Sequence, residues 1–310
     1  MSEPRRPLSE IIAQTLYSGE DIRLSDLARL SDLNDDGLPQ FKKAWGSAAL
    51  DRRLLLISKL YSLGEDDARL DFTGIFNFCL DDPDADIRIK ALEGLELEDK
   101  FTFALPVIRT LKTDDSPDVR EAAARVMGKF ALMAELGELP AAVGDQIFDA
   151  LLEVLEDPPQ PGPLRKRVLE SIAPFRQEVV ASYIEDYYYS DDPLLKAGAI
   201  FAMGRNCDPR WLDFLTEELR SSNSQFRFEA ARACGEIGDE EAVPGLLNLL
   251  NDDDHEAQEA AIAALGRIGG QEARDALDGL RTSHENRIRE AALSALTELE
   301  ICQDPTSSSS

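Results

Sequence analysis

The chain has 310 residues, with 33 Lys and Arg against 60 Asp and Glu, and a formal net charge of −27. This charge argues against non-specific binding to nucleic acid or to an anionic membrane surface, because both need Lys and Arg to meet phosphate. It favours a basic partner protein. Because the first residues lack an apolar signal segment and no run of about 18 apolar residues occurs, we expect a cytoplasmic protein.

Residues 1–46 are predicted to form an N-terminal helical cap, because they do not match the pattern of the later sequence. Helices are expected over 8–16, over 25–33 with Ser25 as the N-cap, and over 39–45. A terminal segment with a polar outer side is typical of stacked-repeat proteins, whose first repeat would otherwise expose its apolar face.

Residues 47–300 are predicted to form about seven to eight helix pairs, joined by turns rich in Asp, Pro, Ser and Asn. Side-chain oxygens in such turns cap the following helix by accepting its free backbone N–H groups. The expected helices span 47–63, 68–80, 86–97, 100–111, 118–132, 143–155, 164–173, 179–189, 194–204, 210–219, 225–237, 242–250, 256–268, 271–280 and 287–299.

Two segments depart from this pattern. An insertion over 131–144 contains Gly137, Pro140 and Gly144 and predicts either a longer loop or a helix extension. Residues 301–310 form a polar, serine-rich tail that is predicted to be disordered.

The second helix of each pair repeats at a nearly fixed period. One anchor column is separated by 32, 45, 31, 31, 31 and 31 residues, which indicates a stacked-repeat architecture. Alanine dominates the position three residues later, bulkier apolar residues the position seven later, and small residues the position eight later; these offsets share one helix face. The anchor column consists of Arg88, Arg120, Arg165, Lys196, Arg227, Gln258 and Arg289.

The combination of a capped turn, Val/Ile-Arg, Ala-Ala, Leu-Gly, Ile-Gly and Ala-Val-Pro resembles HEAT repeats, closely over 225–297 and loosely over 68–224. It is most similar to the short kind, of roughly 30 residues, found in phycobilisome-lyase-like proteins. The resemblance implies an all-α fold, a right-handed α-solenoid or superhelix of stacked antiparallel helix pairs. It also implies a scaffold, an adaptor or, in a few relatives, a lyase subunit.

Several patterns that can signal chemistry have structural alternatives. Asp82, Asp84 and Asp86 followed by Glu93 match calcium-loop spacing, but Ile87 stands where that loop needs glycine, so helix capping is favoured. The two histidines, His255 and His284, are expected to be solvated turn residues. The four cysteines lack metal or redox spacing and are expected to be buried thiols: Cys79, Cys207, Cys234 and Cys302.

A tyrosine run offers one candidate contact surface. Tyr183 and Tyr187 are one helical turn apart and are predicted to pack together. Tyr188 and Tyr189 point elsewhere, so at least one of them is expected to be exposed, and both are candidate partner contacts. Packing within the chain is the alternative.

The second helices offer another candidate surface. Offsets of two, five and nine from the anchor lie opposite the buried stripe and hold seven basic against five acidic residues, although the whole chain is strongly acidic. If these helices line the concave side, their face is a groove for another protein. The alternative is a ladder of salt bridges between repeats, for example Arg232 with Glu229 or Glu236. The predicted contacts are Arg125, Arg167, Phe201, Arg205, Arg232 and Arg267.

No nucleophile–base pair, phosphate loop or metal-binding motif is recognised, so we expect no enzymatic activity and no cofactor. The predicted function is a non-catalytic scaffold or adaptor that binds another protein on the concave face. A phycobilin-lyase-like or chaperone-like subunit acting on a tetrapyrrole-bearing protein is the alternative.

Overall fold

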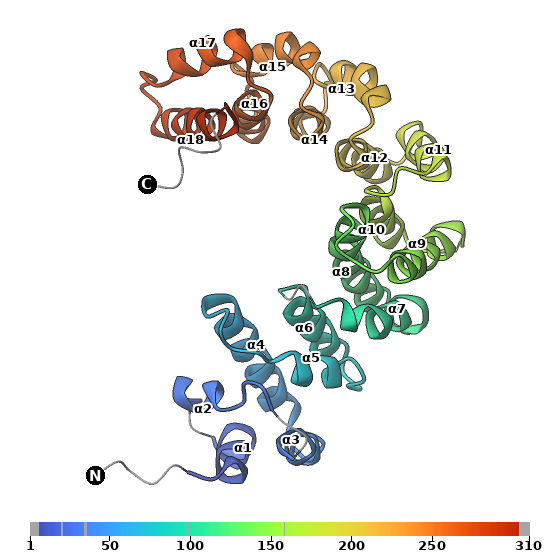
Figure 1. Cartoon of the computed structure of the whole chain (residues 1–310), viewed down its shortest axis with the longest axis vertical. Coiled ribbons are helices and arrows are strands. Elements are labelled where there is room, and N and C mark those ends of the chain that lie inside the picture. Colours follow the sequence, from blue (N-terminus) through green and yellow to red (C-terminus); the bar gives the residue numbers. More distant parts are fainter. Residues whose placement is uncertain (1–5, 20, 34–35, 98–99, 158, 304–310) are drawn as a thin grey trace. The chain divides into compact units, whose positions relative to one another are not determined.

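The computed structural model describes residues 6–19, 21–33, 36–97, 100–157 and 159–303 (Figure 1). Within these ranges every regular element is an α-helix or a short 3-10 helix. The chain divides into two units, unit 1 over residues 1–164 and unit 2 over residues 165–310. No helix among the described residues is both long and apolar enough to cross a membrane.

Unit 1 contains the segment predicted as an N-terminal cap and the first helix pairs. The second helices α4, α6 and α8 stack on one another, and the first helices α5, α7 and α9 cover their outer side (Figure 1). The helices of this unit are α1 (Leu8–Tyr17), α2 (Leu24–Ala28), α3 (Gly37–Trp45), α4 (Leu50–Asp66), α5 (Thr73–Cys79), α6 (Ala85–Glu96), η1 (Phe101–Phe103), α7 (Ala104–Thr113), α8 (Pro117–Glu135) and α9 (Ala141–Glu156). Helix α10 (Gly162–Ile172) begins at the boundary between the units.

Unit 2 repeats the same arrangement with greater regularity. The second helices α12, α14, α16 and α18 pack side by side on the inner side of an arc, and the first helices lie outside them (Figure 1). The helices after α10 are α11 (Glu178–Tyr188), α12 (Pro193–Asn206), η2 (Pro209–Trp211), α13 (Leu212–Glu218), α14 (Ser224–Ile237), η3 (Glu240–Ala242), α15 (Val243–Leu249), α16 (His255–Ile268), α17 (Gly270–Leu280) and α18 (Asn286–Gln303).

The N-terminal cap differs from the expectation at α2. This helix spans only Leu24–Ala28, and Arg23 rather than Ser25 precedes its first turn. The chain cannot continue as a helix to residue 33, because Asp32 adopts a φ of 48° and its backbone N–H donates to the Asp71 carbonyl at 2.7 Å. The indole of Trp45 at the end of α3 donates to the Asp82 carboxylate at 2.7 Å and ties the cap to the turn before α6.

Aspartate and asparagine cap the second helices, as the turn sequences predict. Asp84, Asp192, Asn223 and Asp254 each accept a backbone N–H from the first turn of the helix that follows. These side chains satisfy donors that would otherwise lack a partner, and three of them add a negative charge at the positive end of the helix dipole. The short, capped turns fix where each second helix begins.

The repeat columns form the core of each unit. The anchor-plus-three alanines are buried, and so are Cys234 and Leu265 at anchor-plus-seven. Glycine at anchor-plus-eight allows neighbouring second helices to approach closely. A Cβ on Gly235 would lie 2.9 Å from the Cα of Ala264, and one on Gly204 would lie 2.7 Å from the Cα of Ala233. The small residues therefore set the spacing of the stack.

The two segments that depart from the repeat pattern, 131–144 and 301–310, have different outcomes. The insertion over 131–144 is a helix extension, since α8 continues to Glu135 before a short turn leads to α9. In the predicted tail, residues 301–303 belong to the last turn of α18, whereas residues 304–310 lie outside the described residues.

Candidate functional site

The most distinctive surface group on the second helices of unit 2 is an arginine that contacts two aromatic rings. The guanidinium carbon of Arg232 lies 5.4 Å from the ring centre of Phe201 on α12 and 5.5 Å from that of Phe228 on α14. Both distances are within the range of a cation–π interaction. We call Arg232, Phe201 and Phe228 the arginine clamp.

A buried carboxylate lies beneath the arginine clamp. Glu229 is 8% exposed and accepts a hydrogen bond from the Gln225 amide at 2.9 Å. Its distance to the Arg232 guanidinium is 3.5 Å, at the long end for a hydrogen bond. Burial raises the pKa of Glu229, and the positive charges of Arg232 and Lys166 oppose that rise only in part.

The other predicted arginines are all in ion pairs, and Arg125, Arg205 and Arg267 pair across consecutive second helices, as in the salt-bridge ladder that was the alternative to partner contact. Arg205 reaches Glu236 at 3.9 Å, and Arg267 reaches Glu298 at 3.2 Å, so charges alternate along this row of unit 2. Each pair joins two consecutive second helices. In unit 2 Arg167 pairs with Glu170 within α10 at 2.7 Å, and in unit 1 Arg125 pairs with Glu96 at 2.8 Å.

Arg125 lines a hollow of about 570 Å³ on the second helices of unit 1. Tyr61 and Leu97 supply its apolar wall, and Lys90 lies 5.4 Å above the Tyr61 ring. Lys90 also pairs with Glu93 at 2.5 Å. The hollow therefore combines an aromatic surface with charges that are already paired.

The tyrosine run divides into buried and exposed members. Tyr183 and Tyr187 pack edge to face at 6.5 Å, as predicted. Tyr188 is buried, and its hydroxyl donates to Glu218 at 2.9 Å, so it has little surface to offer a partner. Tyr189 is 71% exposed and is the member that faces solvent.

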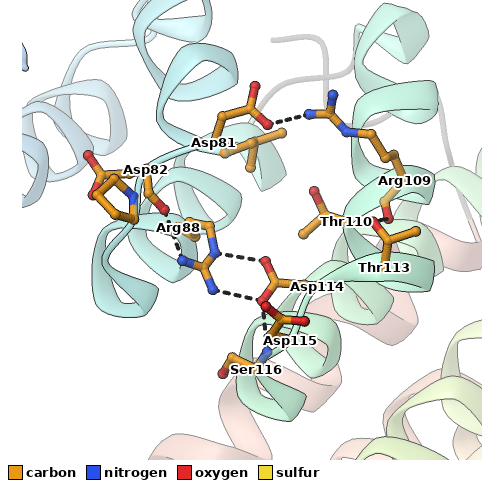
Figure 2. Close-up of a pocket in the computed structure, with 11 residues that line it drawn as sticks. Asp81, Asp82, Arg88, Arg109, Thr110, Thr113, Asp114, Asp115 and Ser116 are labelled. Carbon is orange, nitrogen blue, oxygen red and sulfur yellow. Dashed lines mark hydrogen bonds and ion pairs between the residues drawn. The ribbon is translucent and has the colours of Figure 1, made fainter.

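Two of the anchor arginines, Arg88 and Arg227, form a staple between consecutive repeats, which the sequence did not reveal. In unit 1 Arg88 donates two hydrogen bonds of 2.7 Å to Asp114 and one of 2.9 Å to the Asp82 carbonyl (Figure 2). Arg109 bonds Asp81 across the same hollow of about 580 Å³. The signal that could have found the staple is an aspartate in the next inter-helix turn, 26 residues after Arg88 and 25 residues after Arg227.

The calcium-like spacing is a capping arrangement. Asp82 accepts from Trp45 and pairs with Arg53, Asp84 caps α6, and Glu93 pairs with Lys90. Across the residues that the structure describes, no group of three or more His, Cys, Asp or Glu side chains could hold a metal ion.

The histidines and the described cysteines do not come together in a common metal or catalytic site. His255 and His284 are both exposed, and Arg287 bonds the His255 ring at 2.8 Å. Cys79 and Cys234 are buried as predicted, and burial raises the pKa of Cys234 to about 12. Cys207 is half-buried, and the side chain of Cys302 lies outside the described residues.

A family model described as HEAT repeats matches residues 73–143, 178–258 and 212–297, together more than half of the chain. The chain belongs to the HEAT-repeat family. The predicted all-α solenoid is therefore confirmed, and these HEAT repeats span parts of both units. The narrower resemblance to phycobilisome-lyase-like repeats stays a prediction, because the matching model describes HEAT repeats in general.

Individual proteins are similar to this chain either in sequence or in structure. Deoxyhypusine hydroxylase of Bos taurus is 31% identical and that of Homo sapiens 30% identical over 112 residues, which are 36% of this chain and 37% of each relative. Yeast importin-beta (Kap95p) is structurally similar, with a TM-score of 0.55 and 14% identity over 94% of this chain and 45% of that one. The importin-beta similarity concerns the fold alone.

The expectation that the protein is not an enzyme is wrong on this comparison. Two relatives with about 30% identity are named as hydroxylases, so the absence of familiar catalytic motifs did not justify a non-catalytic reading. HEAT repeats have the same packing positions in binding proteins and in enzymes. The recognisable pattern of the sequence consists mainly of these packing positions, so it does not distinguish the two functions. The aligned part spans only about a third of the length of these relatives.

Proposed function

We propose that this HEAT-repeat protein binds another protein through the second-helix face of unit 2, with the arginine clamp as the central contact. The observation that supports this most directly is the contact of Arg232 with both Phe201 and Phe228. Buried or half-buried arginines and aromatics dominate the binding energy of many interfaces. The complex of Kap95 with Nup1 is a precedent for protein binding by a similar fold in that protein.

The clamp suits a partner carboxylate. The two rings restrict the Arg232 side chain before binding, so less conformational freedom is lost when a partner docks. Its side chain remains 40% exposed, and its contact to Glu229 is long. A guanidinium in this state can form short, paired hydrogen bonds with a carboxylate group.

Arg205 extends the same surface. It lies one helical turn from Phe201 on α12, and its 3.9 Å pair with Glu236 is longer than a hydrogen bond. A partner segment with two acidic residues flanking an apolar side chain would match Arg205, Phe201 and Arg232. The acidic residues of such a segment would neutralise the charges of Arg205 and Arg232 without disturbing the core beneath them.

The proposal is tested by affinity purification from the native host with the full chain as bait and quantitative mass spectrometry. The double variant Arg205→Glu/Arg232→Glu should lose a defined set of partners, because both receptor charges are reversed. Arg281→Glu is the matched control, since Arg281 makes a comparable pair with Asp278, three residues away, at the end of α17. An unchanged partner set in the double variant, with an unchanged melting temperature, would remove the proposal.

A second candidate function is hydroxylation, favoured by the similarity to the two deoxyhypusine hydroxylases. Protein purified from its host without chelators, supplied with O2 and a two-electron reductant, should then convert a deoxyhypusine-containing protein into a product heavier by one oxygen atom, the other oxygen atom leaving as water. Intact-protein mass spectrometry measures this change, and heat-denatured protein is the control. An unchanged mass after prolonged incubation would count against this candidate.

A further inference from the structure

An exposed aromatic surface lies on the outer, first-helix layer of unit 2, away from the arginine clamp. Tyr189, at the end of α11, is 71% exposed, and its ring packs edge to face against Phe214 of α13 at 6.4 Å. Phe214 is half-buried and also contacts Tyr188 at 5.2 Å and Trp211 at 5.8 Å. We call Tyr189 and Phe214 together the Tyr189–Phe214 surface.

A buried network holds this surface in place. The Tyr188 hydroxyl donates to Glu218 at 2.9 Å, and the Lys196 ammonium lies 2.7 Å from the same carboxylate. Lys196 also lies 4.6 Å from the centre of the Tyr188 ring. The base on which Tyr189 packs is thus fixed before any partner arrives, which lowers the entropy lost on binding.

Carboxylates predominate in the two segments that carry this surface. Residues 183–194 contain four carboxylates and no basic residue, and residues 212–219 contain three carboxylates and no basic residue. Asp213 and Glu217 are exposed one turn apart on α13, on either side of Phe214 in sequence. Two of the nearby cations are paired, because Lys196 pairs with Glu218, and Arg210 pairs with Asp208 and Glu178. Arg220 lines the same hollow as Asp213 and Glu217.

We propose that the Tyr189–Phe214 surface binds a basic, lysine- or arginine-containing segment of a partner protein. A cation over the exposed Tyr189 ring gains a cation–π interaction, and the carboxylates of Asp213 and Glu217 neutralise its charge. A second copy of this chain does not fit as the occupant, since each copy carries a net charge of −27. This surface is separate from the arginine clamp, so either proposal can fail while the other stands.

The test uses the full chain and a fluorescein-labelled peptide of Gly-Lys-Arg repeats, with binding measured by fluorescence anisotropy. A matched peptide with Gln at each Lys and Arg should not bind. Tyr189→Ala should weaken binding roughly tenfold, and Tyr189→Phe should retain it, because the ring face remains. Equal affinity for wild type and Tyr189→Ala would overturn the proposal.

General attraction to an acidic protein must be separated from a specific surface. Asp213→Asn/Glu217→Gln should weaken peptide binding several-fold. Asp145→Asn/Asp149→Asn is the matched control, since these residues are also exposed, acidic and one turn apart on a first helix, α9. An equal loss of affinity in both double variants would show a diffuse charge effect and would overturn the proposal.

Discussion

The guanidinium of Arg227 donates two hydrogen bonds of 2.7 Å to the carboxylate of Asp252, which lies in the turn before the next second helix. A third bond of 2.9 Å goes from Arg227 to the Ser221 carbonyl in the turn before its own helix. Arg88 and Asp114 have the same geometry in unit 1. One side chain therefore fixes two successive turns, and the repeat stack is held at its edge as well as in its core.

Replacing Arg227 by lysine should lower the free energy of unfolding by about 2 kcal/mol, because an ammonium cannot form the paired bonds. The side chains of Arg227 and Asp252 are only 16% and 9% exposed, so water compensates poorly for the loss. Urea denaturation followed by circular dichroism measures the change. Arg281→Lys, at an exposed pair, should change the value by less than about 0.5 kcal/mol, and equal effects would contradict the staple.

The same pair makes stability depend on pH in one direction. Hydrogen bonding from Arg227 holds the pKa of Asp252 below its ordinary value of 3.8. A carboxylate with a lowered pKa in the folded state stabilises the fold above its unfolded pKa and loses that contribution as pH falls through the folded pKa. The difference in urea midpoint between wild type and Asp252→Asn should therefore be full above about pH 4 and shrink below it. A difference that grows towards low pH would contradict this assignment.

The anchor-plus-eight glycines make a prediction about overpacking. Gly235→Ala should lower the free energy of unfolding by about 1–3 kcal/mol, because the new Cβ would lie 2.9 Å from the Cα of Ala264. Gly279→Ala is the matched control in α17, where no atom lies within 4 Å of the added Cβ. That variant should be more stable by about 0.5–1 kcal/mol, from helix propensity. Thermal melting of both variants checks the contrast, and a stabilising Gly235→Ala would disprove close helix contact.

Leu265 tests the register of the core. Its side chain is fully buried in α16, so Leu265→Ala should cost about 2–5 kcal/mol by leaving a cavity. Leu136→Ala, at a side chain that is 64% exposed, should have little effect. Hydrogen exchange should also speed up in α14 and α18, since neighbouring repeats stabilise each other. Unchanged protection in both helices would contradict this coupling.

The sequence predicted the helices well because the period and the caps are local signals. The Asp254 cap and the buried Ala261 and Leu265 all follow from one column alignment. The end of α2 could not be predicted in this way. It depends on the Asp32 N–H reaching the Asp71 carbonyl, a contact between residues far apart in the chain.

The candidate contacts were only partly predictable, because a side chain's partner depends on the next repeat. Arg232 was expected on the surface, but its contact with both Phe201 and Phe228 needed the distance between α12 and α14. Tyr188 and Tyr189 are indistinguishable in sequence, yet Glu218 of α13 accepts a hydrogen bond from one and leaves the other in solvent. Whether the protein is an enzyme could not be predicted from the repeat columns, because these columns reflect helix packing.

The glycine–alanine contacts of unit 2 also affect how the number of repeats can change in evolution. Gly204, Gly235 and Gly266 meet Ala233, Ala264 and Ala295 at distances of 2.7 to 2.9 Å between the added Cβ and the facing backbone. Because these interfaces are equivalent, a 31-residue module can be duplicated or removed in frame without creating a new kind of junction. Duplication or loss of whole repeats in the gene can thus change the length of the solenoid.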